Sequence, residues 1–334
     1  MVTIGDVAER AGVARSTVSY ALSGKRPISP ETQRRIEAAI SELGFTPNAG
    51  ARALATAKTM VIGLLVQFVE GEFAPAMMQY VVTVADAARE AGYDILMLTE
   101  QDGPKALNRV ANSNMVDGAI LLNVTYEDRR IPVLRTLRQP GALIGHPKDT
   151  RGVDVFDLDY AATAYVIVDH LYERGHRDVV LITPQESVFG SGGAYAWRFR
   201  NAVLERAAQR EIRVVVFQGQ TQQPSLGEQI GEILDSTPEA TAWIVHNDAV
   251  IAALPIALHT RGVAVPDDLS IVGVFSDGFR KMFSLPYTAV ESNIGKLSRA
   301  AVRSLIRRIQ DPEGDLADEL VLLAPELIDR GTTR

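Results

Sequence analysis

The 334-residue sequence predicts an α/β protein that carries a small helical module at its N-terminus. Residues 3–44 repeat apolar side chains with the period of amphipathic helices, whereas residues 60–334 alternate apolar strand signals with helical ones. Alternating strands and helices form parallel sheets that helices cover on both faces, and the alternation runs through two successive rounds. We therefore expect a three-helix module followed by two doubly wound parallel-sheet subdomains.

The composition is that of an ordinary globular protein, with 46% hydrophobic and 22% charged residues. The absence of cysteine excludes disulfides and thiol chemistry. The opening residues MVTIGDVAER lack the basic flank and apolar run of an export signal. The longest strongly apolar run, MVIGLLVQFV, has 10 residues and is too short to span a bilayer. These features predict a cytoplasmic protein.

The formal net charge of −7 is unevenly distributed. Residues 1–58 hold eight Lys or Arg and five Asp or Glu, a net charge of +3, which leaves −10 on the remaining residues. A basic module on an acidic body suggests a polyanionic partner for the module alone. Because a charge of +3 is common in a segment of this size, charge by itself favours nucleic acid only weakly.

The first predicted helix lies in TIGDVAERAG. Thr3 is suited to cap it, and Asp6 stands three residues later, at the spacing of a capping box. Gly12 is suited to end it, because glycine readily adopts the left-handed conformation of a helix end. Its apolar residues share one face: Ile4, Val7, Ala8 and Ala11.

A second helix is predicted in RSTVSYAL, with Val18 and Leu22 on its inner face. Its outer face is polar and consists of Arg15, Ser16, Ser19 and Tyr20. The third helix is predicted to start at Pro30 after the cap Ser29 and to stop at Gly44. Its apolar stripe is Ile36, Ala39, Ile40 and Leu43.

Two helices joined by a tight turn that contains glycine, with a third helix closing the core, make a helix-turn-helix arrangement. The polar outer face of the second helix suits entry into the major groove of DNA. A generic three-helix bundle is the alternative reading of the same periodicity.

Longer stretches of the chain resemble the LacI/GalR family of bacterial repressors. These stretches are TIGDVAERAGVARSTVSYALSG, ISPETQRRIEAAISELGFTPNAGARALA, VIGLLV, DGAILL, LYERGHRDVVLI, VPDDLSIVGV and LIDRG. The resemblance implies a lambda-repressor-like helix-turn-helix domain, a hinge helix and a core of periplasmic-binding-protein-like type I. The expected domains are 1–46 for DNA binding, 47–59 for the hinge, 60–160 with 291–322 for the N-subdomain, and 161–290 with 323–334 for the C-subdomain.

By position, the resemblance assigns DNA contacts to the second helix and the loop after it. Arg15, Ser16 and Tyr20 fall where family members read base edges. Arg15 could contact guanine through two hydrogen bonds, worth about 1–3 kcal/mol of discrimination, or contact a phosphate instead. The positions suited to phosphate contacts are Ser19, Lys25 and Arg26.

The stretch PNAGARALA, residues 47–55, falls where the family has its hinge helix. A helix shorter than about 12 residues is marginal in water, so we expect this one to form when two subunits pair it on DNA. The resemblance places the hinge contacts in the minor groove on Asn48, Ala53 and Leu54, with Leu54 as a wedge between base pairs. The alternative is that Leu54 is an ordinary apolar residue in a tether.

Effector contacts carry over from the family at six positions: Phe73, Arg198, Asn247, Asp248, Phe275 and Asp277. Phe73 could instead pack within its loop, and Arg198 could be a surface charge. Either Asn247 or Asp248 could act as a helix cap. Where many members have an acidic pair after IVG, this chain has Phe275 and Ser276, with Asp277 one place later.

No catalytic pattern is visible in the sequence. The five histidines lack metal-ligand spacing, and neither G-x-S-x-G nor a phosphate-binding loop occurs, so we expect no enzyme, cofactor or metal site. The resemblance implies a homodimeric repressor of palindromic operator DNA whose effector is a sugar or sugar derivative acting as inducer. Some members use a corepressor instead. The alternative function is a solute receptor or enzyme with a helical extension.

Overall fold

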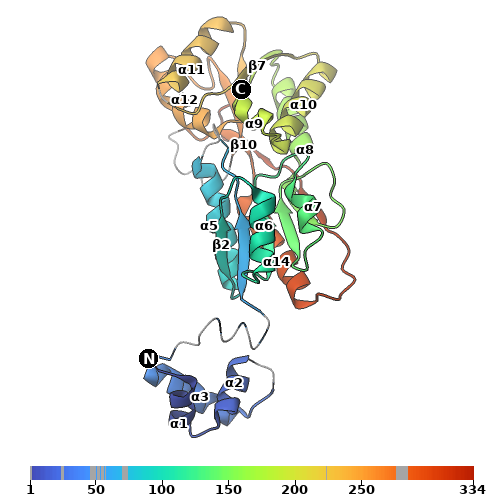
Figure 1. Ribbon diagram of the computed structural model, residues 1–334. Helices are drawn as coiled ribbons and strands as arrows, with labels where there is room; N and C mark the ends of the chain where they lie inside the picture. The colour runs from blue at the N-terminus through green and yellow to red at the C-terminus, as the bar shows by residue number, and fades with distance from the viewer. Residues whose placement is uncertain are drawn as a thin grey trace.

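The computed structural model describes residues 2–23, 26–45, 50, 53, 56, 58–69, 74–222, 224–275 and 285–334 (Figure 1). These residues form an N-terminal helical module and two parallel-dominated sheets, which confirms the predicted fold class. In the described part of the chain, no helix is both long and apolar enough to cross a membrane.

The N-terminal module consists of α1 (Ile4–Ala11), α2 (Arg15–Ser23) and α3 (Pro30–Leu43). The predicted capping box is present: the Thr3 N–H donates to Oδ2 of Asp6 at 2.7 Å, and the Asp6 N–H donates to Oγ1 of Thr3 at 3.4 Å. Ser29 caps α3 by accepting from the Thr32 N–H. The predicted boundaries of α1 and α3 are confirmed because they rest on such local contacts.

Gly12 and Gly44 end α1 and α3 with φ angles of 65° and 61°, the left-handed region that favours glycine. The helices pack their predicted apolar faces against one another. The buried side chains of this small core are Val7, Ala8, Ala11, Val18, Ile36 and Ala39.

The first sheet has the strand order β11-β5-β4-β3-β1-β2, and every neighbouring pair in it is parallel. Its strands are β1 (Val61–Leu65), β2 (Asp94–Leu98), β3 (Gly118–Leu121), β4 (Gly141–Ile144), β5 (Asp154–Leu158) and β11 (Leu320–Leu323). The helices that accompany it are α5 (Ala74–Glu90), α6 (Gly103–Asn112), α7 (Arg130–Leu134) and α14 (Ile294–Gln310).

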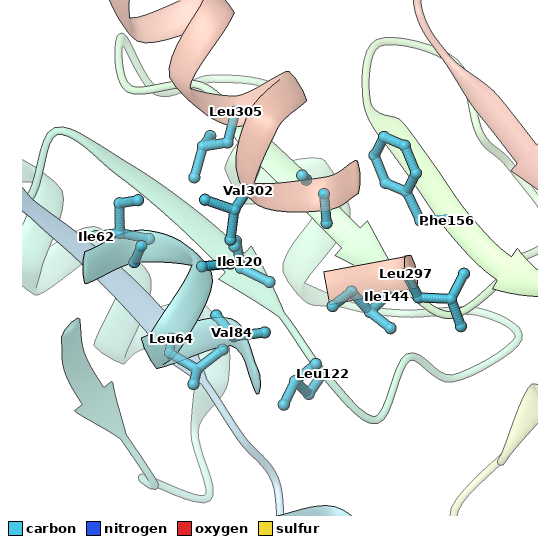
Figure 2. Packing of buried hydrophobic residues seen from close by; sticks show 14 of the residues in the cluster. Ile62, Leu64, Val84, Ile120, Leu122, Ile144, Phe156, Leu297, Val302 and Leu305 are labelled. Atoms are coloured by element: carbon cyan, nitrogen blue, oxygen red, sulfur yellow. The ribbon is translucent and has the colours of Figure 1, made fainter. Parts of the chain in front are cut away.

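One face of this sheet is covered by α5 and α14. Figure 2 shows Val84 of α5 and Val302 and Leu305 of α14 among the strand side chains. Each fully buried aliphatic side chain contributes about 1.5–3 kcal/mol relative to exposure, so this layer fixes α14 to the first sheet. The other face is packed by α6 and α7 through residues such as Leu107 and Leu134.

The second sheet repeats the plan with the strand order β12-β10-β9-β8-β6-β7. Its strands are β6 (Asp178–Thr183), β7 (Arg213–Gln218), β8 (Ala242–Val245), β9 (Ser270–Phe275), β10 (Thr288–Glu291) and β12 (Leu327–Ile328). Its helices are α8 (Tyr160–Glu173), α9 (Glu186–Gly190), α10 (Ala194–Gln209), α11 (Ser225–Ser236) and α12 (Asp248–Arg261).

The strand β12 departs from the expected parallel arrangement, because it pairs antiparallel with β10. Between β10 and β12 the chain forms α14 and β11 of the first sheet, and it returns to the second sheet at β12 without a further helix. The chain passes between the sheets three times: from β5 to α8, from β10 to α14, and from β11 to β12. These three connections tie the two sheets together.

Candidate functional site

The outer face of α2 is polar, as the sequence predicted. Arg15, Ser16 and Tyr20 are exposed and Ser19 is half-buried, whereas Val18 faces the core with no exposed surface. Arg26 is exposed in the loop that follows, and Lys25 lies outside the described residues. The candidate base-reading residues therefore share one accessible helix face.

Several other basic side chains of the module are committed to its own fold. Arg10 pairs with Glu42, and Arg35 donates to the carbonyl oxygens of Ala11 and Gly12 at the end of α1. These contacts leave Arg15 and Arg26 as the better candidates for DNA contacts.

The candidate hinge is described at three positions. Gly50, Ala53 and Thr56 are helical; Gly50 is exposed and Ala53 is half-buried. The other two predicted hinge contacts, Asn48 and Leu54, lie outside the described residues. Just beyond the hinge, the carboxylate of Asp117 accepts from the backbone N–H groups of Thr59 at 2.7 Å and Met60 at 2.9 Å. This contact anchors the base of the hinge to the first sheet.

A cleft lies where the carboxyl ends of strands from both sheets meet, the usual ligand position in such sheets. It encloses a cavity of about 150 Å³. The residues that line it at the strand ends or just beyond them include Asn123, His146, Asp157, Pro184, His246, Asn247, Asp248 and Phe275. Both subdomains therefore contribute walls to one site.

Asp157, at the end of β5, is the buried carboxyl group of this cleft, with 5% of its surface exposed. Its Oδ1 accepts from the Leu158 N–H at 2.9 Å, while Oδ2 has no hydrogen-bond partner among the described residues. Burial raises the pKa of Asp157 to about 7, although two backbone N–H groups and the charge of Arg198 oppose the rise.

His246 lies on the opposite side, after β8, inside an aromatic cluster. Its ring centroid is 4.5 Å from that of Phe199, 5.5 Å from that of Tyr195 and 5.6 Å from that of Tyr160. Its Nδ1 is buried without a partner in the described structure, and burial lowers the pKa of His246 to about 3. The imidazole is therefore neutral at physiological pH.

Arg198, predicted to hold an effector, lies beside the cleft and contacts the loop after β4. It extends from α10 and donates to the carbonyl oxygens of His146 and Pro147, each at 3.2 Å, and is not among the described lining residues. Those carbonyls belong to the loop after β4 in the first subdomain. Arg198 thus ties the two subdomains together beside the cleft.

A second tie lies close to Arg198 in sequence. The Tyr126 N–H, in the loop after β3, donates to the carbonyl oxygen of Gly192 at 2.9 Å, and Thr125 forms an isolated antiparallel bridge with Gly193. The loops at this edge of the cleft are therefore in direct contact across the two subdomains.

The remaining predicted effector residues divide into two groups. Asn247 and Asp248 line the cleft and begin α12, and Phe275 lines it at the end of β9. Phe73 and Asp277 lie outside the described residues.

Asn247 is largely occupied by the fold. Its side-chain oxygen accepts from the N–H groups of Ala249 and Val250, and its amide nitrogen donates to the carbonyls of Thr183 and Gly219. The helix-cap reading of Asn247 is thus confirmed, and its main effect on the cleft is to hold the start of α12 in place.

A buried ion pair supports the wall contributed by β3. Arg130 and Asp128 have side chains that are 1% and 3% exposed, and the guanidinium also donates to the carbonyls of Leu122 and Asn123 at 2.9 and 3.0 Å. Burial opposes ionisation of Asp128, but the hydrogen bonds and charge of Arg130 hold its pKa below the usual value. The pair fixes Asn123, which has a φ angle of 50°.

Sequence reasoning missed Asp157, His246, His146 and the three tyrosines that line the cleft, which are Tyr80, Tyr160 and Tyr195. A signal for Asp157 was present, because VDVFDL places a carboxylate at the end of an otherwise apolar strand. His246 precedes Asn247 directly in WIVHND, but nothing local distinguishes it from a structural histidine.

Comparison with known families finds two matches along the chain, one to the helical module and one to the C-terminal half. Residues 3–48 match the bacterial regulatory proteins of the lacI family, and residues 168–333 match the periplasmic binding protein-like domain.

Two curated relatives match along nearly their whole length. The HTH-type transcriptional repressor PurR of Actinobacillus pleuropneumoniae serotype 3 (strain JL03) is 26% identical over 339 residues, which cover 100% of this chain and 99% of the relative. The repressor of the same name from Serratia proteamaculans (strain 568) is 29% identical over 337 residues, which cover 99% and 96%.

Solved structures share the fold. The lac repressor dimer bound to operator and the anti-inducer ONPF superposes with a TM-score of 0.78 at 23% identity, over 99% of both chains. The complex of the transcriptional regulator CelR with cellobiose superposes with a TM-score of 0.67 at 24% identity, over 99% of this chain and 100% of the other. The arrangement of helical module and two sheets is thus shared from end to end.

Proposed function

Because the chain belongs to the LacI family of bacterial regulatory proteins, we propose that its module reads operator DNA as a transcriptional repressor and that a small molecule in the cleft controls this binding. The observation that carries the proposal is that one chain joins an exposed polar helix face on α2 to a cleft built by two sheets. The relatives that match its whole length are transcriptional repressors, not enzymes.

In the proposed complex, α2 enters the major groove. Arg15 and Ser16, in its first turn, and Tyr20, one turn later, contact base edges. Ser19, Lys25 and Arg26 contact phosphates and set the position of the helix without reading sequence.

We propose that the repressor acts as a homodimer on a palindromic site. The edge of the first sheet supports this, because apolar residues are exposed on α5 and on the edge strand β2: Met78, Val82 and Met97 are 42%, 53% and 46% exposed. Ile256 on α12 of the second subdomain is 76% exposed. A second copy of the chain would cover these side chains and place two modules on two half-sites.

The hinge couples the cleft to DNA in this proposal. Two paired hinge helices enter the minor groove through Asn48, Ala53 and Leu54, and Leu54 partly unstacks a base step so that the duplex bends. Because Asp117 anchors Thr59 and Met60 to the first sheet, movement of that subdomain reaches the base of the hinge. Effector binding shifts the paired N-subdomains, separates the hinge helices and lowers operator affinity, so that the effector acts as an inducer.

We propose that the cleft binds its ligand without transforming it. Burial lowers the pKa of His246 to about 3, which makes the imidazole a weak base, and no partner within the described residues orients its Nδ1, so it is not poised as a general base. A sugar-like inducer suits a cavity that combines polar and aromatic walls.

Selection from a random duplex library tests the DNA-binding half of the proposal. We expect enrichment of an inverted repeat whose affinity falls steeply with salt, because several phosphates are neutralised. Arg15→Ala should cost about 1–3 kcal/mol and relax specificity at one base pair of each half-site. Arg303→Ala, which removes an exposed arginine of α14, is the matched control. Recovery of no preferred sequence would favour a receptor or enzyme with a helical extension.

A further inference from the structure

The cleft offers a ligand buried hydrogen-bond acceptors and two carboxyl groups. Its acidic residues are Asp157 and Asp248, and its described walls contain neither lysine nor arginine. Arg198 lies nearby; its Nη2 already donates to two carbonyls of the neighbouring loop, whereas its Nε is buried without a partner among the described residues. Within the described walls, an anionic ligand would therefore meet two carboxyl groups and no lysine or arginine, at a high desolvation cost.

The carboxyl group of Asp157 has one committed oxygen and one open one. The Leu158 N–H fixes Oδ1, while Oδ2 is buried without a partner among the described residues, on a residue that lines the cleft. A buried acceptor without a donor is costly, and a ligand that supplies the donor recovers that cost on binding. The hydrogen bonding of the Asp157 carboxyl group is thus completed only when a ligand with a donor occupies the cleft.

We propose that the effector is an uncharged or cationic molecule that donates a hydrogen bond from O–H or N–H to Oδ2 of Asp157, and that phosphorylated and carboxylated compounds are excluded. This inference rests on the effector cleft proposed above. The cavity of about 150 Å³ is the size of an engineered cavity that holds benzene, so it suits a small ligand. The rings of Tyr160, Tyr195 and His246 form an aromatic wall beside it.

Binding should also depend on pH. Asp157 is faced by Arg198 from α10 and His146 from the loop after β4, with Asp159 and Tyr160 following on its own segment. Because its pKa lies at about 7, Asp157 is mostly protonated at pH 6 and mostly ionised at pH 8. A donor on the ligand favours the ionised form, so affinity should rise about tenfold between pH 6 and pH 8, with release of a proton on binding below pH 7.

A paired thermal-shift screen of the full chain tests the ligand class. The pairs are glucose with glucose 6-phosphate, ribose with ribose 5-phosphate, and adenine with adenosine monophosphate, each at pH 6 and pH 8. We expect a neutral member to raise the Tm, more strongly at pH 8, and its phosphate to have no effect. The sugar and adenine arms separate an O–H donor from an N–H donor.

The inference is overturned if a phosphate stabilises the chain as strongly as its neutral parent, or if no neutral compound acts. Salt-dependent binding to the selected inverted repeat is measured on the same preparation. If the wild-type chain does not bind the repeat, the result counts against the proposed function. If it binds the repeat but no neutral compound stabilises it, the result counts only against the inference.

The variant Asp157→Asn tests the residue itself. It should still bind the inverted repeat but bind the active neutral compound at least tenfold more weakly and without pH dependence. Asp86→Asn, at a half-exposed carboxylate of α5 away from the cleft, should behave as wild type. Unchanged affinity in Asp157→Asn would mean that Oδ2 meets only an internal water. Calorimetry of the wild type in two buffers of different ionisation enthalpy measures proton release directly, so the test does not depend on the variant folding.

Discussion

The buried carboxyl group of Asp157 predicts a specific dependence of stability on pH. Its pKa of about 7 in the folded chain lies above the ordinary value of 3.8. Between these two values the folded chain holds a proton that the unfolded chain has lost, so the free energy of unfolding falls as pH rises through this window and levels off above pH 7. The carboxyl group therefore destabilises the ligand-free chain at neutral and alkaline pH.

The magnitude follows from the shift. One pKa unit corresponds to about 1.36 kcal/mol, so the full penalty is about 4 kcal/mol above pH 7. Of this, about 2.5 kcal/mol develops between pH 5 and pH 8. Asp157→Asn removes the charge and keeps the oxygen that accepts from the Leu158 N–H. The free energy of unfolding of the variant, relative to wild type, should therefore rise by about 2.5 kcal/mol from pH 5 to pH 8.

Urea unfolding at a series of pH values measures this difference. Circular dichroism follows the whole chain, and fluorescence follows the second subdomain, because both tryptophans, Trp197 and Trp243, lie there. Asp86→Asn is the control and should run parallel to wild type. If Asp157→Asn also ran parallel to wild type from pH 5 to pH 8, Asp157 would be ionised throughout, and the reasoning from its burial would be refuted.

Three further substitutions test other parts of the account. Gly50→Ala should tighten operator binding about 30-fold in a dimer, because each of the two hinge helices gains about 1 kcal/mol of stability. It should also weaken effector-driven release. Equal operator affinity of the variant and the wild type in filter binding would contradict this. Arg130→Met should lower the free energy of unfolding by about 3–5 kcal/mol, because it leaves the buried Asp128 unpaired. The double variant with Asp128→Asn should recover most of this loss. Urea titrations measure both differences. Val82→Glu on α5 should shift sedimentation towards the monomer, while Gln209→Glu should not; an intact Val82→Glu dimer would exclude this face.

The helical module could be predicted almost residue by residue because its signals are local. Thr3 with Asp6, and Ser29 with Pro30, mark helix starts through contacts within one turn, and Gly44 marks a stop. The two sheets followed from the alternation of strand and helix signals. The antiparallel strand β12 could not be predicted this way, because its direction depends on a short connection between subdomains.

The cleft was harder to predict from the sequence, because its hydrogen bonds and burial depend on contacts between residues far apart in the chain. Arg198 was identified as a candidate, but its partners are the carbonyls of His146 and Pro147, about fifty residues earlier in the chain. The burial that shifts the pKa of Asp157 arises from packing between two subdomains, and no local pattern encodes it. The DNA-contact and effector-contact assignments remain predictions that the substitutions above would test.

The coupling between cleft and operator is the central claim, and its direct measurement is a thermodynamic cycle. The dissociation constant of the selected inverted repeat is determined with and without a saturating neutral compound from the paired screen, and that of the compound with and without DNA. We expect the compound to weaken operator binding by a factor of about 5–150, and the DNA to weaken compound binding by the same factor. Equal operator affinity with and without the bound compound would contradict the account.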